Sequence, residues 1–202
     1  MDTDDFDAVQ QVINLFHESI EAKMHVIDDL APLVADAADI ISQCFLDDNK
    51  IMIVGNGTSG TIAQQFTANL ISRHQKERPS LPAICLNTDI ITLGAIANDS
   101  NYNEVYAKQI RALGHTGDLL FAVTTDSSSA TLVHAIKAAH DREMSVIVLT
   151  GSDEGDTASI LTQEDLEICV QSESFPRLHE IHLLTIFCLC DLIDKQIFGS
   201  LS

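Results

Sequence analysis

The sequence predicts an α/β protein built on a five-stranded parallel, doubly wound sheet, flanked by an N-terminal helical hairpin and a long apolar C-terminal helix. Two observations support this fold class. From Lys50 onward, five short apolar runs alternate with stretches of helical periodicity. Within the runs, polar and apolar residues do not alternate, so both faces of each strand are expected to be buried, as in a parallel sheet. Repetition of strand and helix is typical of doubly wound layers.

Residues 1–48 predict the helical hairpin, which we expect to serve oligomerisation, whereas residues 49–202 form the main domain. The face expected to be buried in the first helix consists of Val9, Val12, Ile13, Phe16 and Ile20, which follow helical spacing. Pro32 suits the first turn of a second helix, which Asp47-Asp48-Asn49 closes. A hairpin of this size lacks the bulk to fold alone and must pack on another surface.

The remaining elements follow from the apolar runs and the segments between them. The expected strands are Ile51–Val54, Ala83–Leu86, Leu119–Val123, Val146–Leu149 and Leu166–Val170. The expected helices are Ile62–Arg73, Ile90–Ile96, Glu104–Leu113 and Ala130–His140, with a shorter one near Asp156–Leu161. Pro176 opens a last helix that ends near Phe198 and has almost no polar stripe in its middle. A helix that is apolar all round must be covered all round, which predicts a homo-oligomer.

Composition excludes several classes of function. The chain of 202 residues carries a net charge of −19, and residues 1–48 hold 12 acidic residues and one basic residue, a net charge of −11. Such a surface repels phosphate backbones and anionic membranes, so we expect no direct nucleic-acid or membrane binding. The apolar run Leu183–Cys190 is far shorter than the roughly 20 residues that span a bilayer. Five cysteines without a C-x-x-C pair predict buried free thiols in a reducing cytoplasm.

Two loops that follow predicted strands are candidates for ligand binding. The first loop, residues 55–60, reads Gly-Asn-Gly-Thr-Ser-Gly. It matches the dinucleotide fingerprint, but the acidic residue that this fingerprint requires about 20 residues later is not in place, since Glu77 comes too early and Asp89 too late. Its glycines still allow close approach of a ligand to the backbone, and amides at a helix start attract an anion. Asn56, Thr58 and Ser59 add groups that suit hydroxyls.

The second loop, residues 124–129, reads Thr-Thr-Asp-Ser-Ser-Ser. Serial hydroxyls at a helix N-terminus form a phosphate cradle, and they also cap the helix. Three serines after two threonines exceed what one cap requires. Asp126 places a negative charge inside this cradle and argues against tight phosphate binding.

Together with Asn98-Asp99 and the apolar closing helix, these loops resemble the sugar isomerase (SIS) domain family, whose fold is flavodoxin-like. The segments that carry the resemblance are GNGTS at 55–59, RPSLPAICLNTD at 78–89, AIAND at 95–99, EVYAKQIRALGHTGD at 104–118 and LLTIFCLCDLID at 183–194. They are similar to two branches, the phosphoheptose isomerases and the DnaA initiator-associating proteins. The resemblance implies a phosphosugar site made by Asn56, Gly57, Thr58, Ser59, Asn98, Asp99, Thr124, Thr125 and Ser129.

The catalytic and metal-binding positions of the isomerase branch are changed in this chain. Its metal-binding histidine and catalytic glutamate correspond to Gln65 and Asn69, and its glutamine ligand and catalytic histidine to His179 and Phe187. Asn69 and Phe187 cannot accept a proton, which isomerisation requires. Two amides and one imidazole make a poor zinc site. The resemblance therefore implies no catalysis and no metal. We expect His182 to be structural and Glu180 to brace the loops.

The resemblance implies a non-catalytic homotetramer that binds the replication initiator DnaA and promotes its assembly at the chromosomal origin. It places the partner contact at Ile197 and Phe198; alternatively, Phe198 only closes the helix against the core. Two other functions remain open. One is a zinc-dependent sedoheptulose 7-phosphate isomerase of lipopolysaccharide heptose biosynthesis, and the other is a regulatory module that binds a phosphosugar.

Overall fold

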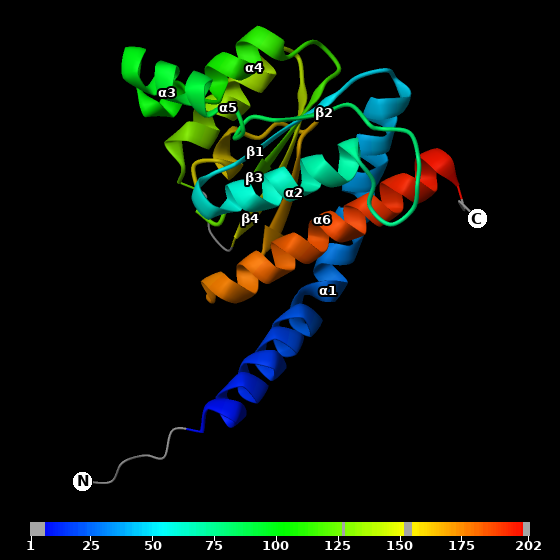
Figure 1. Ribbon diagram of the computed structural model, residues 1–202. Helices are drawn as coiled ribbons and strands as arrows, with labels where there is room; N and C mark the ends of the chain where they lie inside the picture. The colour runs from blue at the N-terminus through cyan, green and yellow to red at the C-terminus, as the bar shows by residue number, and fades with distance from the viewer. Residues whose placement is uncertain (1–6, 127, 152–154, 200–202) are drawn as a thin grey trace.

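The computed structural model describes residues 7–126, 128–151 and 155–199, which form three layers around a five-stranded parallel sheet (Figure 1). The strands are β1 (Ile51–Gly55), β2 (Ala83–Cys85), β3 (Leu119–Val123), β4 (Ser145–Gly151) and β5 (Leu166–Val170). Their order is β2-β1-β3-β4-β5, the doubly wound order whose direction reverses between β1 and β3. The predicted fold class is confirmed, and each strand lies within two residues of its predicted bounds.

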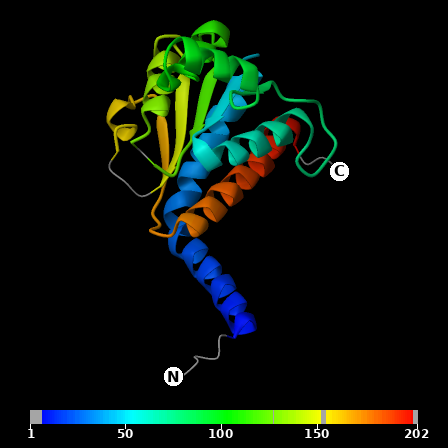
Figure 2. The ribbon, with the colours of Figure 1, turned by 60° about the vertical axis from the view of Figure 1, so that its left-hand side comes forward.

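Helices cover both faces of the sheet (Figure 2). In β1, Ile51 and Ile53 pack with α1 (Ala8–Leu46), α2 (Gly60–Ile71) and α6 (Phe175–Phe198). Met52 and Val54 point to the opposite face and pack with α4 (Ala107–Leu113) and α5 (Ala130–His140). Successive side chains of a strand point to opposite faces, so an unbroken apolar run supplies both cores. The helix α3 (Ile90–Asp99) lies on the same side as α4 and α5.

Two predicted helices are shorter than expected. The helix predicted over Glu104–Leu113 begins only at Ala107, after the single turn η2 (Tyr102–Glu104). There, the Asn101 side chain accepts a hydrogen bond from the backbone N–H of Asn103 at 2.8 Å, a local bond that competes with helix formation. The helix predicted near Asp156–Leu161 is reduced to the turn η3 (Ala158–Ile160), and the first loop includes the turn η1 (Gly57–Ser59).

The N-terminal segment is one helix and not the predicted hairpin. α1 runs without a break from Ala8 to Leu46, with Pro32 inside it. Val26 before the proline and Val34 and Ile41 after it are all buried in the core that α1 shares with α6 and β5. An interior proline costs about 3 kcal/mol, whereas burial of one large aliphatic side chain contributes about 1.5–3 kcal/mol. Continuous burial on one side of the helix therefore outweighs the local signal of Pro32.

The first half of α1 projects beyond the rest of the molecule (Figures 1 and 2). The apolar face predicted to be buried here is exposed in the single chain, and it consists of Val9, Val12, Ile13, Phe16 and Ile20. Further along the helix, an apolar groove of about 320 Å³ opens between α1 and α6. Ile27, Leu184 and Cys188 are among its lining residues. A single chain thus leaves two apolar areas of α1 uncovered, the projecting face and the groove.

The last helix is covered on one side and open on the other. Ile181, Ile186, Leu189 and Ile193 of α6 are buried, while Leu184 is 40% exposed toward the groove. All five cysteines are free, as predicted, but two of them are not buried. Cys188 is exposed because it lies on this open side, and Cys169 is only half-buried. None of the helices in the described ranges combines the length and apolarity that a membrane crossing requires.

Candidate functional site

The two candidate loops meet where the strand order reverses. Gly55 at the end of β1 pairs in register with Val123 at the end of β3. The amide of the Asn56 side chain donates a hydrogen bond to Ser129 Oγ at 2.8 Å, and Ser129 Oγ lies 2.9 Å from Thr131 Oγ1. Ligands of doubly wound sheets bind at this reversal point. The structure therefore brings the two predicted loops together at this point, and the Asn56–Ser129 bond joins them.

Glycines set the shape of the first loop. A side chain at Gly55 would place its Cβ 2.2 Å from the carbonyl oxygen of Ser59, so the turn closes only with glycine there. Gly57 adopts a φ of +55°, in the left-handed region that glycine tolerates best. Thr58 is exposed, whereas Ser59 is fully buried and its Oγ has no hydrogen-bond partner among the described residues. Buried hydroxyls without a partner are exceptional in native proteins.

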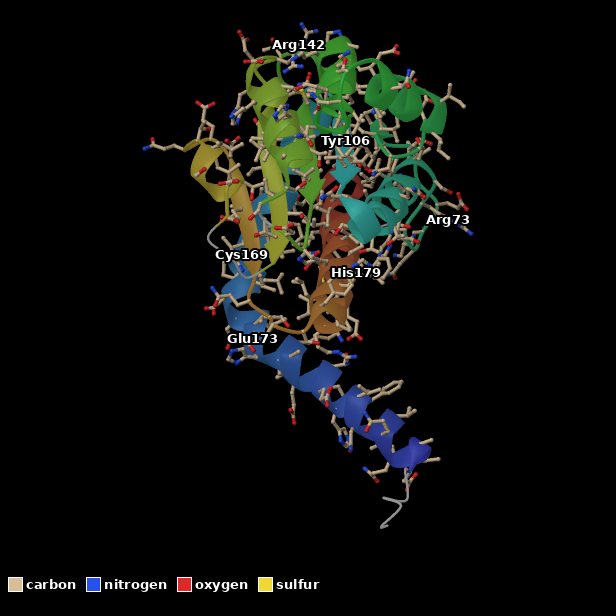
Figure 3. All side chains as sticks on the ribbon, turned by 90° about the vertical axis from the view of Figure 1, so that its left-hand side faces the viewer. Arg73, Tyr106, Arg142, Cys169, Glu173 and His179 are labelled. Atoms are coloured by element: carbon tan, nitrogen blue, oxygen red, sulfur yellow. The ribbon has the colours of Figure 1, made fainter. Side chains whose placement is uncertain are left out.

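Asn87 and Tyr106 fix the first loop on the sheet. Asn87 Oδ1 accepts a hydrogen bond from the Gly55 amide at 2.9 Å, and its Nδ2 donates to the Gly55 carbonyl at 2.7 Å. The same Nδ2 lies 3.0 Å from the hydroxyl of Tyr106, a buried residue that is labelled in Figure 3. Burial raises the pKa of Tyr106 to about 12. Sequence reasoning missed this pair, although Asn87 lies two residues after the end of β2 and a polar residue near a strand end was the available signal.

Hydrogen bonds within the second loop fold it on itself. Thr124 Oγ1 donates to the carbonyl oxygen of Asp126 at 2.7 Å and accepts from the Asp126 amide at 3.0 Å. Asp126 Oδ1 accepts from the backbone N–H of Ser128 at 2.9 Å. Thr125 is half-buried, and Ser127 lies outside the described residues. The carboxylate of Asp126 thus accepts from the backbone amide of Ser128, two residues before α5 begins.

The structure does not bring every predicted site residue to these loops. Asn98 and Asp99 end α3, where both are exposed and Asn98 Nδ2 donates to Asp99 Oδ1 at 3.1 Å. Within the described ranges, no hydrogen bond joins them to either loop. α3 packs chiefly on the turn η2 and stands at the edge of the molecule in Figure 1.

The four positions that correspond to the isomerase metal and acid/base residues lie along α2 and α6. Gln65 Nε2 donates to Asn69 Oδ1 at 2.8 Å, and Asn69 Nδ2 lies 3.7 Å from Cys190 Sγ. The ring of Phe187 stacks on His74 with centroids 5.8 Å apart. This donor set does not fit zinc, which prefers thiolate, imidazole and carboxylate ligands. In the described part of the chain, no cluster of three or more His, Cys, Asp or Glu side chains is placed to hold a metal ion.

The two histidines in the first turns of α6 contact neighbouring groups of the protein. His182 is fully buried, and its Nε2 donates to the Thr150 carbonyl at 2.9 Å. Burial lowers the pKa of His182 to about 4, so the ring is neutral at pH 7. His179, marked in Figure 3, stacks on Phe175 with centroids 6.0 Å apart. His182 therefore links α6 to the end of β4, in keeping with the structural role expected for it.

Glu180 braces α1 and not the loops, contrary to expectation. Its carboxylate accepts a hydrogen bond from Ser19 and pairs with Lys23 at 3.1 Å and with Arg177 at 3.2 Å. Partial burial opposes ionisation of Glu180, but the bonds from Ser19 and Lys23 and the charges of Lys23 and Arg177 hold its pKa below the ordinary value. Arg177 also donates to the carbonyl oxygen of Leu15 at 2.7 Å. This cluster fastens the projecting part of α1 to α6.

Ile197 and Phe198 lie at the other end of α6. Both are half-buried and pack against the core between the sheet and α1, α2 and α6. The Phe198 ring lies 5.8 Å from the guanidinium carbon of Arg78, which pairs with Asp194 at 2.8 Å. Phe198 therefore closes the helix against the core and keeps part of its ring accessible.

Comparisons with known proteins agree with this geometry. A sequence profile of the SIS domain family matches residues 15–151. A phosphoheptose isomerase of Chromohalobacter salexigens is 50% identical over 194 residues, 96% of this chain and 98% of that protein. The DnaA initiator-associating protein DiaA of Cronobacter sakazakii is 48% identical over 183 residues, 91% of this chain and 93% of that protein. The structure of a phosphoheptose isomerase from Francisella tularensis, 37% identical, superposes with a TM-score of 0.90 and covers 94% of this chain and 100% of that one. The chain belongs to the SIS domain family.

Proposed function

We propose that the protein is a non-catalytic SIS-domain homotetramer of the cytoplasm that binds the replication initiator DnaA and promotes its assembly at the chromosomal origin. The proposal that the protein is non-catalytic rests on the side chains that surround Asn69 and Phe187. Asn69 is buried with its amide engaged by Gln65 and Cys190, and Phe187 presents a phenyl ring to His74. Neither side chain accepts the proton that an aldose–ketose isomerisation must move between adjacent carbons.

Neighbouring groups do not replace the missing base. The imidazole of His182 is buried, and its Nε2 is occupied by the Thr150 carbonyl. Glu180 is held as a carboxylate by Ser19, Lys23 and Arg177 at the α1 interface. We therefore propose that no metal cofactor and no isomerase chemistry operate at these positions. A relative that bears the name DnaA initiator-associating protein supports DnaA as the partner.

The exposed apolar surface of α1 supports the oligomer. It combines the projecting face around Phe16 and Ile20 with the groove around Ile27 and Leu184. Contiguous apolar surfaces of this kind mark subunit interfaces in soluble proteins. A tetramer would present four copies of one weak partner site, and repeated copies raise avidity without new contacts.

The proposed partner contact is Ile197 and Phe198, and capture of DnaA by the immobilised protein tests it. We expect Phe198→Ala to weaken capture while the tetramer survives. Phe175→Ala is the matched control, because Phe175 lies at the opposite end of the same helix and is 51% exposed. Absence of DnaA from an intact wild-type tetramer, or equal loss in both variants, would refute the proposed contact.

The second candidate function is sedoheptulose 7-phosphate isomerase with zinc as cofactor. It is favoured by the relatives named phosphoheptose isomerase, among them one from Halorhodospira halophila that is 47% identical over 96% of this chain. Incubation of the purified protein with sedoheptulose 7-phosphate, with and without zinc, separates the two functions. We expect no turnover above background in either condition, and turnover that Asn69→Ala abolishes would establish the isomerase instead.

A further inference from the structure

One series of positions along α1, here called the α1 stripe, keeps a heptad spacing from the projecting half of the helix into the groove. Its positions recur at alternating steps of four and three residues from residue 9 to residue 34. This spacing is typical of a helix that packs lengthwise on another helix. The first four positions are 41–70% exposed on the projecting half (Figure 2), and they are Val9, Ile13, Phe16 and Ile20. This half of α1 therefore lacks the helix that its spacing suits.

The next four positions of the α1 stripe line the groove, and they are Lys23, Ile27, Leu30 and Val34. On the other side of the groove, α6 contributes Leu184 and Cys188, which are both exposed. A cavity of about 150 Å³ holds a benzene molecule. The groove, at about 320 Å³, therefore has room for a phenyl ring together with a neighbouring aliphatic side chain.

The acidic residues of α1 all avoid the α1 stripe. None of them occupies a stripe position or a heptad position that flanks the stripe, so they lie on the outer side of the helix. They are Glu18, Glu21, Asp28, Asp29, Asp36 and Asp39. The strongly negative N-terminal segment can therefore bring its apolar side against a second copy of itself while its carboxylates point away.

We propose that α1 of a second copy lies antiparallel along the α1 stripe, so that the projecting half of each chain fills the groove of the other. The stripe is symmetric about the midpoint between Glu21 and Ala22, and an antiparallel pair therefore matches it position for position. Across the two chains, Val9 lies opposite Val34, Ile13 opposite Leu30, Phe16 opposite Ile27, and Ile20 opposite Lys23. The inference rests on the homo-oligomer of the proposed function and adds the orientation and register of one interface.

A parallel pair fits the same residues less well. It would set Lys23 of one chain against Lys23 of the other inside the apolar seam, and like charges there repel. It would also leave the two grooves facing each other with no side chain to fill them. In the antiparallel pair, the aliphatic stem of Lys23 packs on Ile20 of the other chain while its ammonium stays with Glu180, 3.1 Å away.

Oxidative cross-linking of the full chain tests the register. The background is Cys188→Ser, which removes the exposed thiol of the groove. We expect Phe16→Cys combined with Ile27→Cys to give a covalent dimer on a non-reducing gel, because opposed seam positions come within disulfide reach. Either substitution alone should give no more dimer than the background. Cross-linking of Phe16→Cys alone would show a parallel pair and overturn the proposal.

Labelling of the native Cys188 thiol with a maleimide gives a second measurement that needs no engineered cysteine. We expect slow labelling in the wild type and faster labelling in Phe16→Asp, since the partner's phenyl ring no longer fills the groove. Leu15→Asp is the matched control, because Leu15 is 40% exposed on the same helix but lies off the stripe. This variant should label and sediment as the wild type does.

The outcomes separate this inference from the proposed function. If the wild type sediments as an oligomer but the double cysteine variant does not cross-link and Phe16→Asp labels no faster than Leu15→Asp, the register is wrong and the oligomer stands. A wild type that sediments as a monomer overturns both the register and the homotetramer. Capture of DnaA depends on neither result, because Ile197 and Phe198 lie outside the α1 stripe.

Discussion

Replacement of Arg78 by methionine should destabilise the protein strongly, because Arg78 is the buried centre of a polar network. Its side chain is fully buried, and its Nε donates to Asp194 Oδ1 at 2.8 Å. Its Nη1 donates to the carbonyl oxygens of Leu70 at 2.6 Å and Pro79 at 3.0 Å, and its Nη2 to that of Asn69 at 2.7 Å. The guanidinium thus satisfies the carbonyls at the end of α2 and ties them to α6.

The magnitude follows from what the substitution leaves behind. Asp194 is only 13% exposed, so methionine at position 78 would leave a nearly buried carboxylate without a counter-charge, together with the carbonyls that Arg78 satisfies. Removal of one partner of a buried ion pair costs about 3–5 kcal/mol. For a chain of this size, each kcal/mol lowers the melting temperature by about 2–4 °C, so a decrease of roughly 6–20 °C is expected.

Urea unfolding at fixed protein concentration, followed by circular dichroism, measures this change and separates it from any shift in assembly. The double variant Arg78→Met, Asp194→Leu should recover a large part of the loss, because it removes both charges and leaves an apolar pair. A loss below about 1 kcal/mol for Arg78→Met, or a double variant no more stable than the single one, would refute the assignment of the loss to an uncompensated buried charge.

Three further predictions concern the loop site, the buried histidine and the subunit surface. Asn87→Ala should lower the free energy of unfolding by about 2–6 kcal/mol in thermal melts, because two buried backbone groups of Gly55 lose their partner at about 1–3 kcal/mol each. Exposed Asn101→Ala is the control, and an equal loss in both variants would contradict this. The free energy of unfolding should fall by about 2–3 kcal/mol between about pH 7 and about pH 4.5. In the unfolded chain His182 takes up a proton near its ordinary pKa, whereas in the folded chain it does so only near a pKa of about 4. A His182→Gln variant whose stability has the same pH slope would refute His182 as the cause. Phe16→Asp should reduce the mass measured by sedimentation, and an unchanged mass would remove α1 from the interface.

The sheet was predictable because its central strands β1 and β3 are buried on both faces. β3 has the bounds that its apolar run predicts, since burial on two sides leaves no polar residue within the run. The edge strand β5 also has its predicted bounds, although it contains the half-buried Glu167. The helix α2, which follows the first loop, was equally evident, because its glycine-rich start and apolar periodicity are local in sequence. Such features can be recognised from a short window of the sequence.

Features that depend on distant contacts were not predictable. Pro32 indicates a helix start locally, and only the packing of α1 along α6 and β5 shows that the helix continues. The bonds of Asn87 join residues 32 and 19 positions away in Gly55 and Tyr106, for which no spacing rule exists. The same holds for Glu180, whose need for a partner was evident from its apolar helix but whose pairing with Lys23 was not.

The packing of α1 on α6 affects how the chain can fold as it is made. Lys23 and Glu180 are 157 residues apart, and at about 5–20 residues per second their synthesis is separated by roughly 8–30 s. During this interval the apolar side of α1 has no α6 to cover it, and exposed apolar segments of incomplete chains aggregate. The negative charge of the segment acts against this aggregation. Residues 1–48 carry a net charge of −11, which makes neighbouring nascent chains repel one another. The acidity of this segment thus protects the helix that is synthesised first until the helix that covers it has been made.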